Sequence, residues 1–157
     1  MSKPSKVDYF NEVIGEVATE ISQAYAEFGD LTSYYLGQTS STIQLGLFQP
    51  LALEASLFLV HLLMKRDLKL AATFQNEIED TEESTSQQFI QERLDAYAKE
   101  KDAPSLFTEY CQQVVRSDAN YLSMQRRDDR AQPTISDKGY VAIQKAVIRL
   151  IEAVETI

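Results

Sequence analysis

Apolar residues at the start of the chain recur in alternating steps of three and four, and this spacing constrains the fold more than any other feature. The series is Val7, Phe10, Ile14, Val17, Ile21, Ala24 and Phe28. Such steps place every apolar side chain on one face of an α-helix. The other end of the chain repeats the pattern with Tyr140, Ile143, Val147, Leu150, Val154 and Ile157. Both series predict amphipathic helices that pack as in a left-handed bundle.

The middle of the chain predicts a central helix at residues 50–66. Pro50 suits the first turn of a helix, and residues 57–64 are apolar except for His61. A helix that is apolar on most sides is buried at the centre of a soluble protein. Helical spacing continues to Ile78, so residues 50–79 are compatible with one long helix or with two.

Residues 31–48 carry a different pattern. Ile43, Leu45 and Leu47 alternate with Gln44 and Gly46, which is typical of a short strand, so a short hairpin is one interpretation of this segment. The alternative is a loop followed by a short helix at one end of the bundle.

Helical spacing also marks residues 89–97 and 106–122, and no linker divides the chain. With 157 residues, of which 44% are hydrophobic, the chain is large enough for one continuous core. We therefore predict an all-α fold: one domain over residues 1–157, built as a bundle of about five or six helices.

The chain is acidic, with 24 carboxylates against 15 lysines and arginines and a formal net charge of −9. Proteins that bind nucleic acid directly neutralise phosphates with basic residues, so this balance argues against such a partner and favours a basic protein. The one cysteine, Cys111, forms no internal disulfide and points to a cytoplasmic protein. Residues 43–64 include Gln44, Gln49 and Glu54, which argues against a membrane-spanning segment.

The sequence offers little to catalysis. His61 is the one histidine, and the motifs of P-loop nucleotide hydrolysis, zinc proteolysis and α/β-hydrolases are missing. His61 and Cys111 could form a nucleophilic dyad, but both stand in apolar segments typical of a core. We expect a protein without catalytic residues, metal or cofactor.

Two acidic concentrations are candidates for partner binding. Asp8, Glu12, Glu16 and Glu20 repeat every four residues, which aligns like charges along one ridge of the first helix. Residues 75–102 hold nine carboxylates and three basic residues. The ridge is either a solvated face or a docking strip for a basic protein. The candidate partner-binding residues are Glu12, Glu16, Glu20, Glu79 and Asp80.

Glu54 and His61 interrupt the apolar central helix. They are seven residues apart and therefore lie two turns apart on the same helical face. The pair is a candidate polar pocket between helices, and a buried hydrogen-bonded pair is the plainer alternative.

These observations favour a non-catalytic helical protein that acts in protein interaction or regulation and forms a homo-oligomer through an apolar stripe on a terminal helix. The first alternative is an acidic inhibitor of a basic protein, such as an immunity protein or a mimic of nucleic-acid charge. The second is a helical domain that binds a small molecule.

Overall fold

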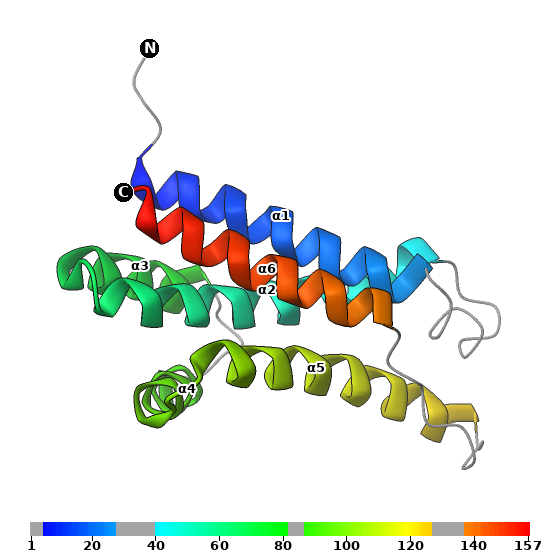
Figure 1. Ribbon diagram of the computed structural model, residues 1–157. Coiled ribbons are helices and arrows are strands. Elements are labelled where there is room, and N and C mark those ends of the chain that lie inside the picture. Colours follow the sequence, from blue (N-terminus) through cyan, green and yellow to red (C-terminus); the bar gives the residue numbers. More distant parts are fainter. Residues whose placement is uncertain (1–4, 28–39, 82–86, 127–136) are drawn as a thin grey trace.

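The computed structural model describes residues 5–27, 40–81, 87–126 and 137–157, and within these ranges the chain forms six α-helices and no strand (Figure 1). The helices are α1 (Lys6–Glu27), α2 (Ser40–Met64), α3 (Leu68–Thr81), α4 (Gln87–Lys99), α5 (Ala103–Arg126) and α6 (Asp137–Glu155). The predicted all-α bundle of five or six helices is confirmed.

Helix α2 is the centre of the bundle, because it packs against each of the other five helices. Four successive residues of α2 are fully buried, namely Leu57, Phe58, Leu59 and Val60. Successive residues point about 100° apart around a helix, so four of them cover its whole circumference. This confirms the predicted buried central helix.

The central helix begins ten residues earlier than predicted, at Ser40. The hairpin interpretation is therefore wrong for residues 40–48, while residues 31–39 lie outside the described part of the chain. Leu47 and Leu51 are both fully buried and stand one helical turn apart. The gain from burying both on one face of α2 outweighs a strand-like alternation that spans only three apolar residues.

Pro50 consequently lies inside α2 and not in its first turn. A proline has no N–H, so the carbonyl of Gly46 loses its usual helical donor four residues later. Gly46 is exposed, and a Cβ added to it would meet no atom within 4 Å. The open surroundings explain how the helix accommodates a proline here.

Residues 50–79 form two helices, joined by a tight turn after Met64. The N–H groups of Arg66 and Asp67 donate to the carbonyl of Leu63 at 3.0 and 2.7 Å. The Asp67 carboxylate then accepts a hydrogen bond of 3.1 Å from the N–H of Leu70 and so caps the start of α3.

Helices α1 and α6 lie side by side and run in opposite directions along α2 (Figure 1). Phe10 and Ile14 of α1 are at most 5% exposed, and Ile143 and Leu150 of α6 are fully buried. Gly139 of α6 packs directly against the Tyr25 ring, where a Cβ would clash. Apart from Tyr140, the described residues of the two apolar stripes are therefore directed into the core of this chain.

Three aromatic residues join α2 to α4 and α5. The rings of Phe58 and Phe107 stack with centroids 4.9 Å apart, and Phe58 lies 5.7 Å from the ring of Tyr97. All three side chains are fully buried. This cluster fixes the positions of α4 and α5 against α2.

Within the described ranges, one segment, Gly46–Met64 of α2, is long and apolar enough to cross a membrane, with a mean hydropathy of 1.6. The bundle buries 56% of that segment, and the core helix of a soluble protein meets the same criteria.

Candidate functional site

A buried ion pair joins α2 to α4. The guanidinium Nη2 of Arg93 lies 3.4 Å from Oε1 of Glu54. The Glu54 side chain is 4% exposed and that of Arg93 is 23% exposed. Because acidic side chains are almost never fully buried unless paired, Arg93 is the group that makes the position of Glu54 tolerable.

Two aromatic rings hold the guanidinium of Arg93 in place. Its Cζ lies 3.5 Å from the ring centroid of Tyr110 on α5 and 5.0 Å from that of Phe89 on α4. A guanidinium over an aromatic face is attracted by the negative face of the ring. Arg93 is therefore positioned by contacts from three helices.

The pair leaves hydrogen-bonding capacity unused. Among the described residues, the buried atoms Oε2 of Glu54 and Nε of Arg93 have no hydrogen-bond partner, and neither does the hydroxyl of Tyr97. Most buried polar atoms in folded proteins are satisfied, so a group of three unsatisfied atoms is unusual. The ion pair thus keeps one hydrogen-bond acceptor, Oε2 of Glu54, and one donor, the Nε–H of Arg93, without a partner in the described part of the chain.

The electrostatics of the pair are set mainly by burial. Burial raises the pKa of Glu54, and the nearby charge of Arg93 opposes the rise. Burial likewise raises the pKa of the Tyr97 phenol, with Glu54 adding to the effect. The surroundings of the pair therefore disfavour any additional charged group that lacks a partner of opposite charge.

Glu54 and Arg93 form part of the wall of an open groove between α2, α4 and α5, with a volume of about 470 Å³. Small-molecule sites are typically mostly apolar and span roughly 300–1,000 Å³. The remaining wall is mostly apolar or aromatic and comprises Gly46, Leu47, Pro50, Leu53, Phe89, Tyr110, Gln113 and Val114. The groove has the size and lining of a small-molecule site.

His61, the other member of the predicted polar pocket, does not line this groove. It is 4% exposed, and its ring stacks on that of Tyr97 with centroids 5.4 Å apart. Burial lowers the pKa of His61, and Lys65 adds to this effect. The structure thus places both side chains in buried positions, Glu54 beside the groove and His61 in the aromatic core.

Cys111 is fully buried on α5. Burial raises the pKa of its thiol well above the ordinary value, and the charge of Glu54 adds to the rise. A thiol in such surroundings stays protonated and is a poor nucleophile.

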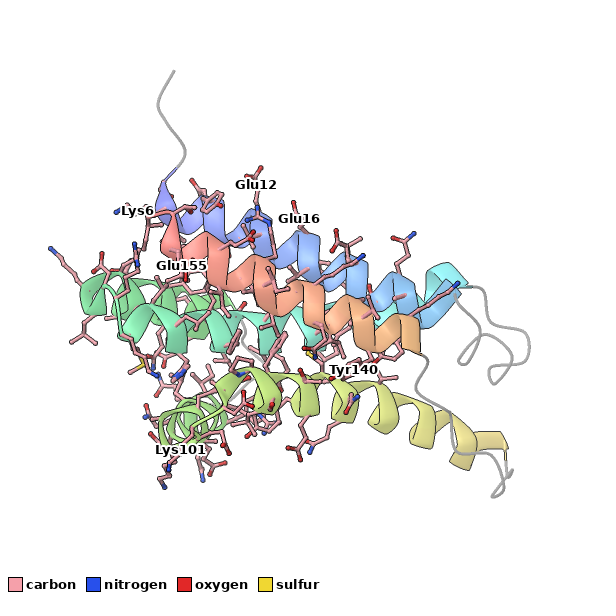
Figure 2. The ribbon with its side chains drawn as sticks, in the orientation of Figure 1. Lys6, Glu12, Glu16, Lys101, Tyr140 and Glu155 are labelled. Carbon is pink, nitrogen blue, oxygen red and sulfur yellow. The ribbon has the colours of Figure 1, made fainter. Side chains whose placement is uncertain are left out.

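The acidic ridge of α1 lies on the outer side of the bundle. Glu12, Glu16 and Glu20 are exposed, and Figure 2 shows Glu12 and Glu16 projecting from that side. Oε2 of Glu16 accepts a hydrogen bond of 2.9 Å from Nε of Arg149 on α6. The three glutamates line a depression of about 530 Å³ together with Arg149.

The second acidic concentration is divided between two sides of the molecule. Within α3, Glu79 is half-buried and accepts a hydrogen bond of 3.4 Å from Gln75, whereas Asp80 is exposed. Helix α4 lies on the side of the bundle opposite to the α1 ridge (Figure 1). The acidic residues of α4 therefore lie away from the α1 ridge, whereas α3 contacts α1 through a hydrogen bond of 3.3 Å from Nδ2 of Asn11 to Oε1 of Glu77.

Most of the apolar stripe of α6 is buried, but Tyr140 at its start is exposed. The large apolar side chains that this helix leaves exposed are Tyr140, Val141 and Ile148, at 47%, 47% and 57%. A homo-oligomer through the terminal helices stays a prediction, and its contact would involve these residues.

Sequence reasoning missed Arg93, Phe89 and Tyr110. One signal was present: Arg93 is the one basic residue among the acidic side chains of residues 77–95, four positions after an aromatic residue. That spacing predicts a contact between Phe89 and Arg93 on one helix, but it does not indicate Glu54, which belongs to another helix.

No protein-family model, curated protein or solved structure matches this chain.

Proposed function

We propose that the protein is a non-catalytic regulatory protein that binds a small molecule in the groove between α2, α4 and α5. The observation that carries this proposal is the presence of a buried, unpaired carboxylate oxygen of Glu54 on the wall of a largely apolar groove of about 470 Å³. An unsatisfied buried group costs free energy that a bound ligand can recover. Among the three functions considered from the sequence, small-molecule binding gains most from this geometry.

The non-catalytic part of the proposal rests on the state of the reactive groups. His61 and Cys111 are both buried, and burial shifts the pKa of each toward its neutral form. The described residues contain no group of three or more His, Cys, Asp or Glu side chains that could hold a metal ion. Ligand binding would act by stabilising the arrangement of α4 and α5 around α2.

The proposal predicts that filling the groove abolishes ligand retention. Gly46 lines the groove and has space for a side chain, so Gly46→Phe should place a ring in the groove. Purified protein is equilibrated with a small-molecule extract of cells, separated by gel filtration, and denatured so that mass spectrometry identifies what it retained. We expect the unsubstituted protein to retain compounds that Gly46→Phe does not.

A matched control exists on the opposite side of the bundle. Gly15 of α1 is also helical, lines a different depression and has nothing within 4 Å of an added Cβ. Gly15→Phe should therefore retain the same compounds as the unsubstituted protein. If all three chains retain the same compounds, or none retains any, the groove is not a small-molecule site.

A second candidate function, binding of a basic protein, is favoured by the exposure of Glu12, Glu16 and Glu20 on one ridge of α1. Complementary charge raises association rates and excludes partners of the wrong sign. Since Glu16 already pairs with Arg149, Glu12 and Glu20 are the residues that would contribute most to such a contact.

Charge reversal tests this candidate. For Glu12→Lys/Glu20→Lys we expect binding of a 20-residue oligolysine at low salt to weaken about tenfold, with a smaller change at high salt because the charges are then screened. The control is Glu92→Lys/Asp95→Lys on exposed positions of α4, which changes the net charge equally. Equal weakening in both variants would mean that only net charge matters, and the docking strip would be rejected.

A further inference from the structure

The chemistry of the groove wall specifies which class of ligand it suits, given the proposed function on which this inference rests. Glu54 and Arg93 carry opposite charges and lie 3.4 Å apart, so the wall has no net charge when both are ionised. A ligand carboxylate that pairs with Arg93 would also lie close to the like charge of Glu54, and a ligand ammonium group that pairs with Glu54 would lie close to the like charge of Arg93. Either charge would lose its hydration and gain only a half-compensated partner, which disfavours charged ligands.

The unused atoms of the pair are complementary to a neutral polar edge. Oε2 of Glu54 can accept a hydrogen bond, and Nε of Arg93 can donate one. A ligand that carries a donor beside an acceptor satisfies both atoms at once. The wall shields both atoms from solvent, so a ligand edge in the groove reaches them only when the side chains of the pair shift toward it.

Gly46 also lines this wall. The carbonyl of Gly46 lacks its usual helical donor because Pro50, four residues later, has no N–H. An additional N–H on the ligand could donate to this carbonyl. Two donors next to one acceptor is the arrangement of a primary carboxamide.

The rest of the wall suits a flat, apolar body. Leu47, Leu53 and Val114 are aliphatic, and Tyr110 adds an aromatic ring whose centroid lies 3.5 Å from the Cζ of Arg93. Planar guanidinium groups and aromatic rings both stack against flat ligands.

We propose that the groove between α2, α4 and α5 binds a neutral aromatic primary carboxamide, whose donor and acceptor pair with Glu54 Oε2 and Arg93 Nε. The specificity follows from the unpaired atoms, because a site that hydrogen-bonds a ligand edge rejects analogues that leave its buried polar groups unpaired.

Three probes of the same size separate the ligand classes. 2-Naphthamide carries the donor and the acceptor, 2-naphthoate is an anion with acceptors only, and 2-naphthylmethylamine is a cation with donors only. Each is titrated into isotope-labelled protein, and the backbone amide shifts are followed by NMR. We expect 2-naphthamide to bind at least about tenfold more tightly than either charged probe and to shift residues of the groove wall.

Two variants assign that preference to the ion pair. Glu54→Leu/Arg93→Met removes both unpaired polar atoms and keeps the wall apolar, so the three probes should bind within about threefold of one another. Gly46→Phe should abolish the shifts, and Gly15→Phe should leave them unchanged. Circular dichroism of each variant checks that the helices are retained.

The outcomes distinguish the ligand class from the proposed function. Preferred binding of naphthoate or the amine in the groove would overturn the carboxamide assignment and leave small-molecule binding in place. Equal binding of all three probes to the unsubstituted protein would also overturn the carboxamide assignment and leave small-molecule binding in place. If no probe shifts the groove residues and the extract experiment shows no dependence on Gly46, both proposals fail.

Discussion

Replacing Phe58 by alanine should lower the free energy of unfolding by about 3–5 kcal/mol, which is the range for truncating a large aromatic side chain in a packed core. Phe58 is fully buried on the central helix and stacks on Phe107 with centroids 4.9 Å apart. Since domains of ordinary size are stable by only about 5–15 kcal/mol, the variant should be close to its unfolding transition. Urea titration followed by circular dichroism at 222 nm measures the change.

An exposed aromatic residue provides the comparison. Tyr140 of α6 is 47% exposed, so Tyr140→Ala should cost less than about 1 kcal/mol. Figure 2 shows Tyr140 on the side of α6 that is turned toward α5. Similar losses for Phe58→Ala and Tyr140→Ala would mean that the aromatic cluster is not the centre of the core.

Removal of Arg93 should be the second most damaging change, and its cost should depend on pH. Arg93→Met leaves the carboxyl of Glu54 buried without its cation, and breaking a buried ion pair in this way costs about 3 kcal/mol. Burial already raises the pKa of Glu54, and Arg93 is the group that opposes this rise. Without Arg93 the pKa of Glu54 in the folded state rises further.

The sign of the pH dependence follows from proton binding. Between the pKa of Glu54 in the unfolded chain, near its ordinary value of 4.5, and the higher pKa in the folded variant, the folded state holds a proton that the unfolded state has released. The stability of Arg93→Met should therefore fall as the pH rises through this interval, by up to about 1.4 kcal/mol per pH unit. Urea unfolding at pH 5.0 and 7.5 measures the difference between the variant and the unsubstituted protein.

The double variant Glu54→Leu/Arg93→Met removes the stranded charge together with its partner. Because a pair of apolar residues can replace a buried ion pair with little loss, most of the stability should return and the additional pH dependence should vanish. A double variant as unstable as Arg93→Met would show that Arg93 acts through its contacts with Tyr110 and Phe89, and not through Glu54.

The local pattern predicted the helices best where an apolar face was long. The α1 and α6 stripes needed no knowledge of their partners, because six or seven residues at steps of three and four are compatible with one periodicity. The segment that begins α2 was harder. Three alternating apolar residues fit either a strand or a helix, and the choice depends on what buries Leu47, which is a tertiary contact.

The groove, too, was only partly predictable from the sequence. Glu54 was recognisable as an unusual polar residue in an apolar helix, and its periodicity with His61 suggested a shared pocket. Periodicity places two residues on a face but does not say what covers each of them. The ring of Tyr97 covers His61, whereas the neighbours of Glu54 are Arg93 and an open groove.

The sequence alone was therefore sufficient to predict the fold class, the buried central helix and the unusual presence of the acidic Glu54 in that helix. Each of these follows from the pattern of residues within a few turns of one helix. The ion pair with Arg93, the aromatic support from Tyr110 and the groove itself required the packed bundle. Residues 54, 93 and 110 lie on three different helices. They meet because the contacting rings of Phe58, Tyr97 and Phe107 hold α4 and α5 against α2. Contacts between such distant residues leave no periodic trace in the sequence.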